Sequence, residues 1–266
     1  MSSILTLPSL PSLFLSHAVP FLLARDEQLK RTLGDLGTRL APKAVLVVNA
    51  HWETEAPTVG RLLGVGMADA SAMLALRVAR QLGAAGIGAV GFDVPDSGAP
   101  GSGAPIQALG GHVFYHDHAL WTPLSLLFPH GPPAVATLSI QPGLTPAHHY
   151  AVGRALRALR QQGVLLIGSG SLTHNHQDVR PQMPAGQALP WAASFVDWIT
   201  ERVNAADTAA LLNYRQLAPF ARHSHPQEDH LLPFFVALGA GAPARGERLH
   251  HGFAMGTISL AAFLFP

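Results

Sequence analysis

Cysteine is absent from this 266-residue chain, and charged side chains make up only 12% of it. Without thiolates, any metal site must use nitrogen and oxygen ligands, so a cysteine-rich structural zinc site is excluded. Lysine and arginine total 17 against 16 acidic residues, and the formal net charge of +1 gives no electrostatic reason to expect nucleic acid or a membrane surface as a partner. The lack of cysteine fits a reducing compartment, and we expect a cytoplasmic protein.

Apolar runs long enough to span a membrane are missing as well, and so are several common nucleotide-binding and hydrolase motifs. Residues 1–24 carry no charge, but prolines interrupt them at positions 8, 11 and 20, and a bilayer-spanning helix needs about 20 mostly apolar residues. No basic stretch precedes this segment, so we expect no secretory signal. The chain has no P-loop, no strand-linked G-x-G-x-x-G and no H-E-x-x-H. Gly168-Ser169-Gly170 does not match the G-x-S-x-G of serine hydrolases.

Apolar runs alternate with helix-like patterns along the chain. Strands are predicted at residues 12–16, 44–50, 134–140 and 163–169, with a weaker one at 86–91 and a last one within 253–266. Helices are predicted at residues 26–40, 68–82, 121–128, 145–161, 190–205, 208–214 and 226–238. This alternation predicts an α/β fold with a mostly parallel central sheet and helices on both faces. We expect a single domain, residues 1–266, in which the Gly/Pro/Ser-rich stretch 97–111 is a flexible loop.

Histidine is abundant, with 15 residues, and neutral imidazole is the commonest side-chain ligand of transition metals. His17, His51 and His174 each fall just past the end of a predicted strand. In open α/β sheets, ligands bind beyond the carboxyl ends of the strands, where such residues converge. The sequence therefore places these three histidines at one edge of the sheet.

Further histidines stand beside acidic residues. Asp117 precedes His118 and is a candidate helix cap or orienting carboxylate, while His118 is a candidate acid–base group. His225 and His230 flank a predicted helix start, and five helical residues turn by roughly 500°, so the two cannot easily bind one ion. Asp229 is interpreted as a surface acid near a helix N-terminus.

Five phrases occur in an order that resembles the class III extradiol ring-cleaving dioxygenases of the LigB-like superfamily, and most closely their DOPA-dioxygenase type. They run the length of the chain: Pro11 to His17, Pro42 into Ala50-His51-Trp52-Glu53, Asp117 to Leu124, Gly168 to Asn175, and His225 to Pro233. The sequence departs from the family where Ala18-Val19 replace a usual Gly-Ser and where Asn49 replaces a usual serine.

The resemblance implies that His17, His51 and His230 bind a divalent metal, with His174 beside it as a base or a fourth ligand and His118 as a hydrogen-bond donor. It implies Fe(II) for activity, although an all-histidine site also accepts Zn(II). The implied substrates are a small aromatic diol and O2, and a homo-oligomer is left open. Glu53 is the carboxylate nearest in sequence if one is needed as a ligand. Phe14, Trp52 and Trp121 are candidates for an apolar wall, although aromatics are more often core.

Two alternatives remain at this stage. A zinc-dependent hydrolase can use the same histidines, with His174 or Glu53 as the base. A non-catalytic interaction protein of the same fold is the other alternative, and the presence of both His118 and His174 argues against it.

Overall fold

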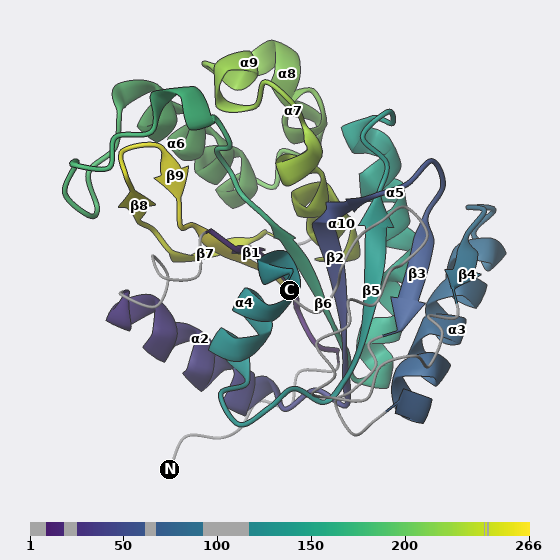
Figure 1. Ribbon diagram of the computed structural model, residues 1–266. Helices are drawn as coiled ribbons and strands as arrows, with labels where there is room; N and C mark the ends of the chain where they lie inside the picture. Colours follow the sequence, from purple (N-terminus) through teal and green to yellow (C-terminus); the bar gives the residue numbers. More distant parts are fainter. Residues whose placement is uncertain (1–8, 19–25, 62–67, 93–116, 242, 244) are drawn as a thin grey trace.

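The computed structural model describes residues 9–18, 26–61, 68–92, 117–241, 243 and 245–266. An eight-stranded sheet runs through them in the order β4-β3-β5-β2-β6-β1-β10-β7 (Figure 1). Its strands are β1 (Ser12–Ser16), β2 (Ala44–Glu53), β3 (Thr58–Arg61), β4 (Val90–Phe92), β5 (Ala134–Ile140), β6 (Val164–Gly170), β7 (Glu247–His250) and β10 (Ala262–Phe265). The four central strands β5, β2, β6 and β1 are parallel, whereas β3, β10 and β7 pair antiparallel to their inner neighbours.

Helices cover both faces of the sheet. Successive residues of a strand point to opposite faces, and in the central strands both sets are apolar, so each face needs a covering layer. Leu46, Val48 and Leu166 face one layer, formed mainly by α3 (Ala68–Ala84), α5 (Pro146–Leu156) and α10 (Leu232–Gly241). Val45, Val47 and Leu165 face the other, formed by α2 (Glu27–Leu40) and α4 (His118–Leu127) (Figure 1). The predicted α/β fold, with its mostly parallel sheet and helices on both faces, is confirmed.

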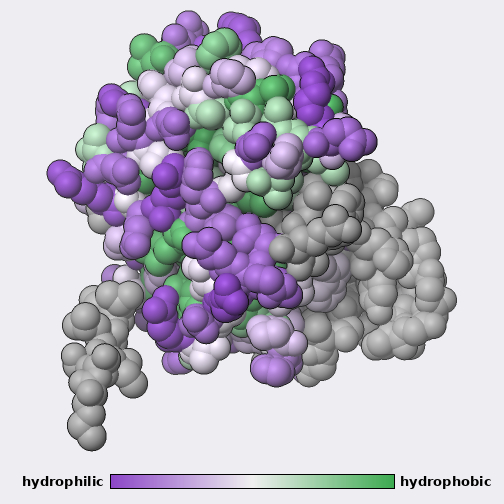
Figure 2. Space-filling view, turned by 90° about the vertical axis from the view of Figure 1, so that its left-hand side faces the viewer, coloured by the Kyte–Doolittle hydropathy of each residue, from purple (hydrophilic) through white to green (hydrophobic). Residues whose placement is uncertain are grey.

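Most of the remaining elements lie around the carboxyl end of the parallel strands (Figure 1), whereas the 3-10 turn Arg157–Gln162 lies at the opposite end, just before β6. The remaining elements are the helices α6 (Pro190–Asn204), α7 (Thr208–Leu212), α8 (Tyr214–Leu217) and α9 (Ala221–Ser224), the 3-10 turns at Arg157–Gln162, His176–Asp178 and Asp229–Leu231, and a small sheet of β8 (Phe253–Ala254) and β9 (Ile258–Ser259). None of the helices in the described ranges is long and apolar enough to cross a membrane. The face on the left of Figure 1 is largely hydrophilic, with smaller hydrophobic patches (Figure 2).

Several predicted boundaries are wrong. The helix predicted at 226–238 is a 3-10 turn at Asp229–Leu231 followed by α10, which runs on to Gly241. The helix at 145–161 gives way to a 3-10 turn after Leu156, and the strand within 253–266 is broken into β8, β9 and β10. α4 begins at His118 rather than at 121, because the Asp117 side chain accepts a hydrogen bond from the backbone N–H of Ala119 and caps the helix.

Two smaller differences concern strands. β3 was not predicted, and the strand expected at 86–91 is formed by Val90–Phe92. The predicted loop 97–111 lies outside the described residues. The single domain expected over residues 1–266 stays a prediction, because it includes ranges that the structure does not describe.

Candidate metal centre

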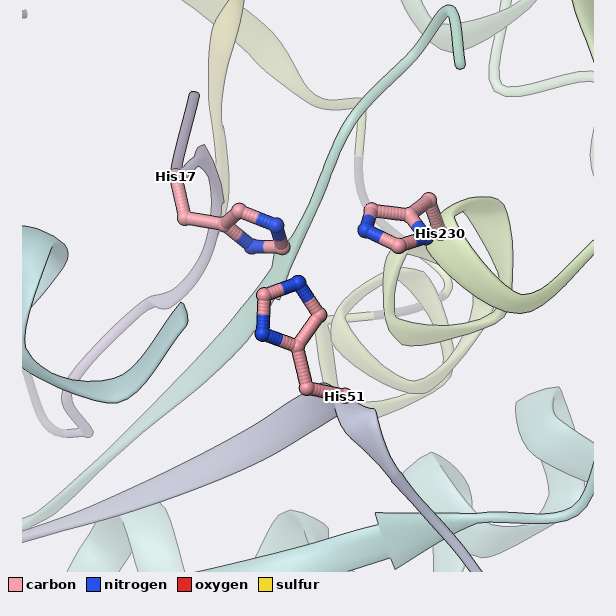
Figure 3. A group of neighbouring side chains, drawn as sticks. All are labelled: His17, His51 and His230. Carbon is pink, nitrogen blue, oxygen red and sulfur yellow. The ribbon is translucent and has the colours of Figure 1, made fainter. Parts of the chain in front are cut away.

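Three histidines from distant parts of the chain meet at the carboxyl end of the parallel strands (Figure 3). His17 directly follows β1, His51 lies near the end of β2, and His230 lies in the 3-10 turn before α10. One ring nitrogen from each lies within 4.8 Å of one from each of the others, so the three can hold a metal ion. The register of β1, β2 and β6 aligns Ser16 with Gly170 and Asn49 with Ser169, which brings the strand ends to one level.

His51 reaches the cluster through an irregularity in β2. The pairing of β2 with β5 jumps from Asn49–Ser139 to Glu53–Ile140, so the residues between them leave the ladder. The Asn49 side-chain oxygen accepts a hydrogen bond from the backbone N–H of His51 at 2.9 Å and fixes this turn. His51 is therefore inside β2 rather than past its end, but it still faces the edge of the sheet.

His230 arrives from outside the sheet. Its carbonyl oxygen accepts a hydrogen bond from the backbone N–H of Ser171 at 2.9 Å, just after β6. A Cβ added to Gly170 would lie only 2.1 Å from that oxygen, so the close approach requires glycine there. Gly170 thus makes room for His230.

The outer ring nitrogen of each of the three histidines has a protein partner. Nδ1 of His51 lies 2.8 Å from Asp117 Oδ1, and Nδ1 of His230 lies 2.6 Å from Asp229 Oδ2. A carboxylate only accepts, so both nitrogens donate. Nδ1 of His17 lies 3.1 Å from Ser169 Oγ, whose own hydrogen goes to the Ala119 carbonyl, so here too Nδ1 donates.

This arrangement leaves Nε2 of His17, His51 and His230 with a free lone pair. Metal-binding histidines characteristically donate their other ring N–H to a carboxylate or another acceptor in this way. The rings in Figure 3 face one another across a common space. The donor set and its supporting hydrogen bonds therefore fit a divalent cation bound by three imidazoles.

Burial and hydrogen bonding set the protonation states of His17 and Asp117 in the centre. Burial, together with the nearby His230 and His51, holds the pKa of His17 well below its ordinary value. Burial raises the pKa of Asp117, but hydrogen bonds from His51 and Asn49 outweigh this and keep it below its ordinary value. At neutral pH His17 is therefore a neutral imidazole and Asp117 an ionised carboxylate, the protonation states that metal binding requires.

Two further predicted residues, His118 and His174, border the same space. The His118 ring lies 4.7 Å from that of His51, centroid to centroid, at the start of α4. The His174 ring stacks on His230 at 3.5 Å with an interplanar angle of 9°. His176, which the sequence did not single out, places its Nε2 2.9 Å from His174 Nε2. Burial is the largest cause that lowers the pKa of both His118 and His174.

These side chains enclose a pocket of about 240 Å³. Within the described residues its lining has no lysine, arginine or carboxylate and consists of His17, Ala18, His51, His118, Ser171, Thr173, His174, Asn175, His176, His230 and Ile258. The three aromatic residues considered as an apolar wall, Phe14, Trp52 and Trp121, do not line this pocket. Phe14 and Trp52 are buried core residues, and Trp121 is only packed against the core. The volume is below the roughly 300–1,000 Å³ typical of sites for drug-sized ligands, so it suits one small ring.

Other residues considered from the sequence stand elsewhere. Glu53 is exposed and belongs to none of the side-chain clusters that can hold a metal in the described ranges. His225 is fully buried, and its Nε2 donates to the Leu172 carbonyl at 2.7 Å. Asp229 is buried rather than a surface acid. No spacing signal identified Asn49 or Asp229 as partners of the cluster, because their contacts form only when the chain is folded.

The sequence matches known proteins over most of its length. Residues 107–266 match the family described as the catalytic LigB subunit of aromatic ring-opening dioxygenase. A 4,5-DOPA dioxygenase extradiol from Portulaca grandiflora is 35% identical over 263 residues, which cover 96% of this chain and 95% of that protein. The chain belongs to the LigB family. The predicted family and class, an extradiol aromatic ring-opening dioxygenase, are thereby confirmed.

Other similar proteins agree with the LigB assignment. A 4,5-DOPA dioxygenase extradiol from Beta vulgaris is 31% identical, with 95% of each chain covered. One from Escherichia coli K12 is 28% identical and covers 87% of this chain and 85% of its own. The crystal structure of an uncharacterized Escherichia coli K12 protein aligns with a TM-score of 0.71 at 24% identity, over 97% of this chain and 100% of that one, which shows a shared fold.

Proposed function

We propose that this chain is a metal-dependent extradiol dioxygenase that opens the ring of a small catechol, of the DOPA type, with O2. The observation that carries the proposal is the set of three Nε2 lone pairs that face one space while every Nδ1 is bonded to the protein. The substrate class comes from the relatives, which are named 4,5-DOPA dioxygenases.

In this proposal His17, His51 and His230 hold the metal on one side of the pocket. Ferrous iron is the working metal, since it supplies the one-electron chemistry that lets a catechol react with O2 and lowers the pKa of the catechol hydroxyls. The same three imidazoles suit Zn(II), so purified protein can carry zinc. The lining formed by the described residues carries no lysine, arginine or carboxylate and suits the un-ionised catechol ring, to which Ala18 and Ile258 give apolar contact.

His174 acts as a general base rather than as a fourth ligand. Lone pairs of ring nitrogens lie in the ring plane, and the His174 ring is nearly parallel to that of His230, 3.5 Å away. The lone pairs of the two stacked rings lie in separate, parallel planes, so His174 would not share an ion with His230. Because burial lowers its pKa, His174 is neutral at pH 7 and can accept a proton from a catechol hydroxyl.

His118 serves the opposite side of the pocket as a hydrogen-bond donor. It is the first residue of α4, and its ring lies 5.4 Å from His17 and 4.7 Å from His51, centroid to centroid. From there it can donate a proton to an oxygen atom that gains negative charge as the ring opens. The zinc hydrolase alternative has less support, because Glu53, one of its two candidate bases, is exposed and belongs to none of the clusters that can hold a metal in the described ranges.

The experiment loads the apo-protein with Fe(II) without oxygen, adds L-DOPA or another catechol from a panel, and then admits air. We expect a yellow ring-fission product that accumulates with O2 consumption. His174→Ala should retain iron and lose turnover, while loss of iron in this variant would make His174 a ligand. A protein that consumes no O2 with any catechol, or that turns over without O2 when loaded with zinc alone, would contradict the proposal.

A further inference from the structure

We propose that two carboxylates behind the ligands, Asp117 and Asp229, are positioning residues that set the affinity of the centre for its divalent cation. This inference rests on the metal site of the proposed function. Neither carboxylate lines the pocket, and each is bonded to the outer nitrogen of one ligand, His51 or His230. Asp117 also precedes His118, and Asp229 also lies close to His174.

Asp117 fixes His51 together with Asn49. Its Oδ1 accepts from His51 Nδ1 at 2.8 Å and from the backbone N–H of Ala119 at 2.9 Å, and its Oδ2 accepts from Asn49 Nδ2 at 2.5 Å. Asn49 is fully buried, and its oxygen holds the His51 backbone. The ring and the main chain of His51 are therefore held by one network, which also caps the helix that begins with His118.

Asp229 plays the corresponding part for His230. Its Oδ2 accepts from His230 Nδ1 at 2.6 Å, and its Oδ1 is buried without a hydrogen-bond partner among the described residues. Asp229, His230 and His174 each offer a ligand atom within 4.8 Å of the others. A buried, unpaired carboxylate oxygen is costly unless positive charge lies nearby. A divalent cation held by His230 would supply that charge.

The charge balance of the centre indicates why the two carboxylates should strengthen metal binding. Three neutral imidazoles contribute no charge to a divalent ion, whereas Asp117 and Asp229 each bring one negative charge at the distance of one imidazole ring. Interactions between charges are strong in a partly buried site. Among the described residues, the hydrogen-bond partner of His17 Nδ1 is the neutral hydroxyl of Ser169. We therefore expect the two aspartates to matter more for metal affinity than Ser169.

The test measures Zn²⁺ affinity of the apo-protein by competition with a chromophoric chelator. Asp117→Asn and Asp229→Asn should each weaken binding by about 10–100-fold, the usual effect of losing such a partner, and Ser169→Ala by less. The matched control is Asp207→Asn, which changes another helix-capping aspartate, at the start of α7 and outside the cluster. This control should bind zinc as the wild type does, since asparagine also caps helices.

A variant that exchanges Asn49 and Asp117 distinguishes the effect of direct contact with His51 from the effect of net charge. In the double variant Asn49→Asp with Asp117→Asn, the carboxylate moves to the other end of the hydrogen bond between these two side chains and leaves His51 Nδ1. Because the proposal requires direct contact with the ligand, the exchange should not restore the affinity lost in Asp117→Asn. Full restoration would show that only total charge matters and would overturn the positioning role.

Folding and function are checked separately. Circular dichroism and thermal unfolding of each apo-variant confirm that it is folded, and Asp229→Asn provides an independent test if Asp117→Asn is not. Wild-type zinc affinity in a folded Asp117→Asn or Asp229→Asn variant overturns the inference. Since no catechol or O2 is used, a failure here is distinct from a failure of ring cleavage.

Discussion

At the level of single residues, the histidines and the orienting carboxylate Asp117 could be found from the sequence, but the partners Asn49 and Asp229 could not. His17, His51 and His174 follow apolar runs, and this position can be read directly from the sequence. Asp229 reads as a surface acid because it stands in a polar phrase at a helix start, yet folding buries it against His230. Glu53 illustrates the reverse case, since it is close to His51 in sequence but exposed.

A buried histidine outside the metal centre, His149, makes the free energy of unfolding depend on pH. His149 is 1% exposed, donates from Nδ1 to the Thr145 carbonyl, and accepts at Nε2 from the backbone N–H of Gln141. Burial lowers its pKa to about 4 from an ordinary value of 6.5. The unfolded chain therefore binds more protons between these values, so the stabilisation is complete above pH 6.5 and is lost as the pH falls toward 4.

We expect His149 to account for about 2 kcal/mol of the stability lost between pH 7 and pH 5. Urea unfolding of the apo-protein and of His149→Gln at both pH values measures this contribution as the difference between their pH dependences. His130, which is exposed, provides the control variant His130→Gln. Equal pH dependence in wild type and His149→Gln would show that the neutral, buried state of His149 is not what opposes acid.

At the level of elements, proline and glycine were recognised as helix signals but assigned to the wrong positions. Pro226 suggested the start of a helix, whereas α10 starts at Leu232 and has Pro233 in its first turn. Gly239 suggested the end, but α10 continues to Gly241. The reason is packing: a Cβ on Gly239 would lie 2.1 Å from the Tyr150 carbonyl oxygen of α5. A glycine needed for contact between helices resembles a glycine that ends one.

The crossing of α5 and α10 gives a prediction about stability. A Cβ on Gly153 of α5 would lie 2.0 Å from the Val236 carbonyl oxygen, the counterpart of the contact at Gly239. Gly153→Ala and Gly239→Ala should each destabilise the protein by about 1–3 kcal/mol, because the helices must move apart. Chemical denaturation measures the change.

The matched control is Gly83→Ala in α3, where an added Cβ meets nothing within 4 Å. This substitution should stabilise the protein by about 0.5–1 kcal/mol through the lower conformational freedom of alanine in the unfolded chain. If Gly153→Ala and Gly239→Ala behave like Gly83→Ala, the close helix contact is absent in solution.

At the level of the whole molecule, β2, β6 and β1 are neighbouring parallel strands, and this explains why the metal centre could be predicted from the sequence. Parallel strands end at the same edge, so residues after them converge whatever their separation in the chain. The approach of His230 and the antiparallel addition of β10 and β7 depend on contacts between distant segments. No local pattern encodes such contacts, and the predictions were weakest there.

The central claim is that three imidazoles from β1, β2 and the turn before α10 share one cation. Anomalous X-ray diffraction from crystals of the Fe(II)-loaded protein, grown without oxygen, tests it most directly. We predict a single strong iron peak about 2.0–2.2 Å from the Nε2 atoms of His17, His51 and His230. An iron peak bound elsewhere, or one that lacks any of these three nitrogens as a ligand, would contradict the account.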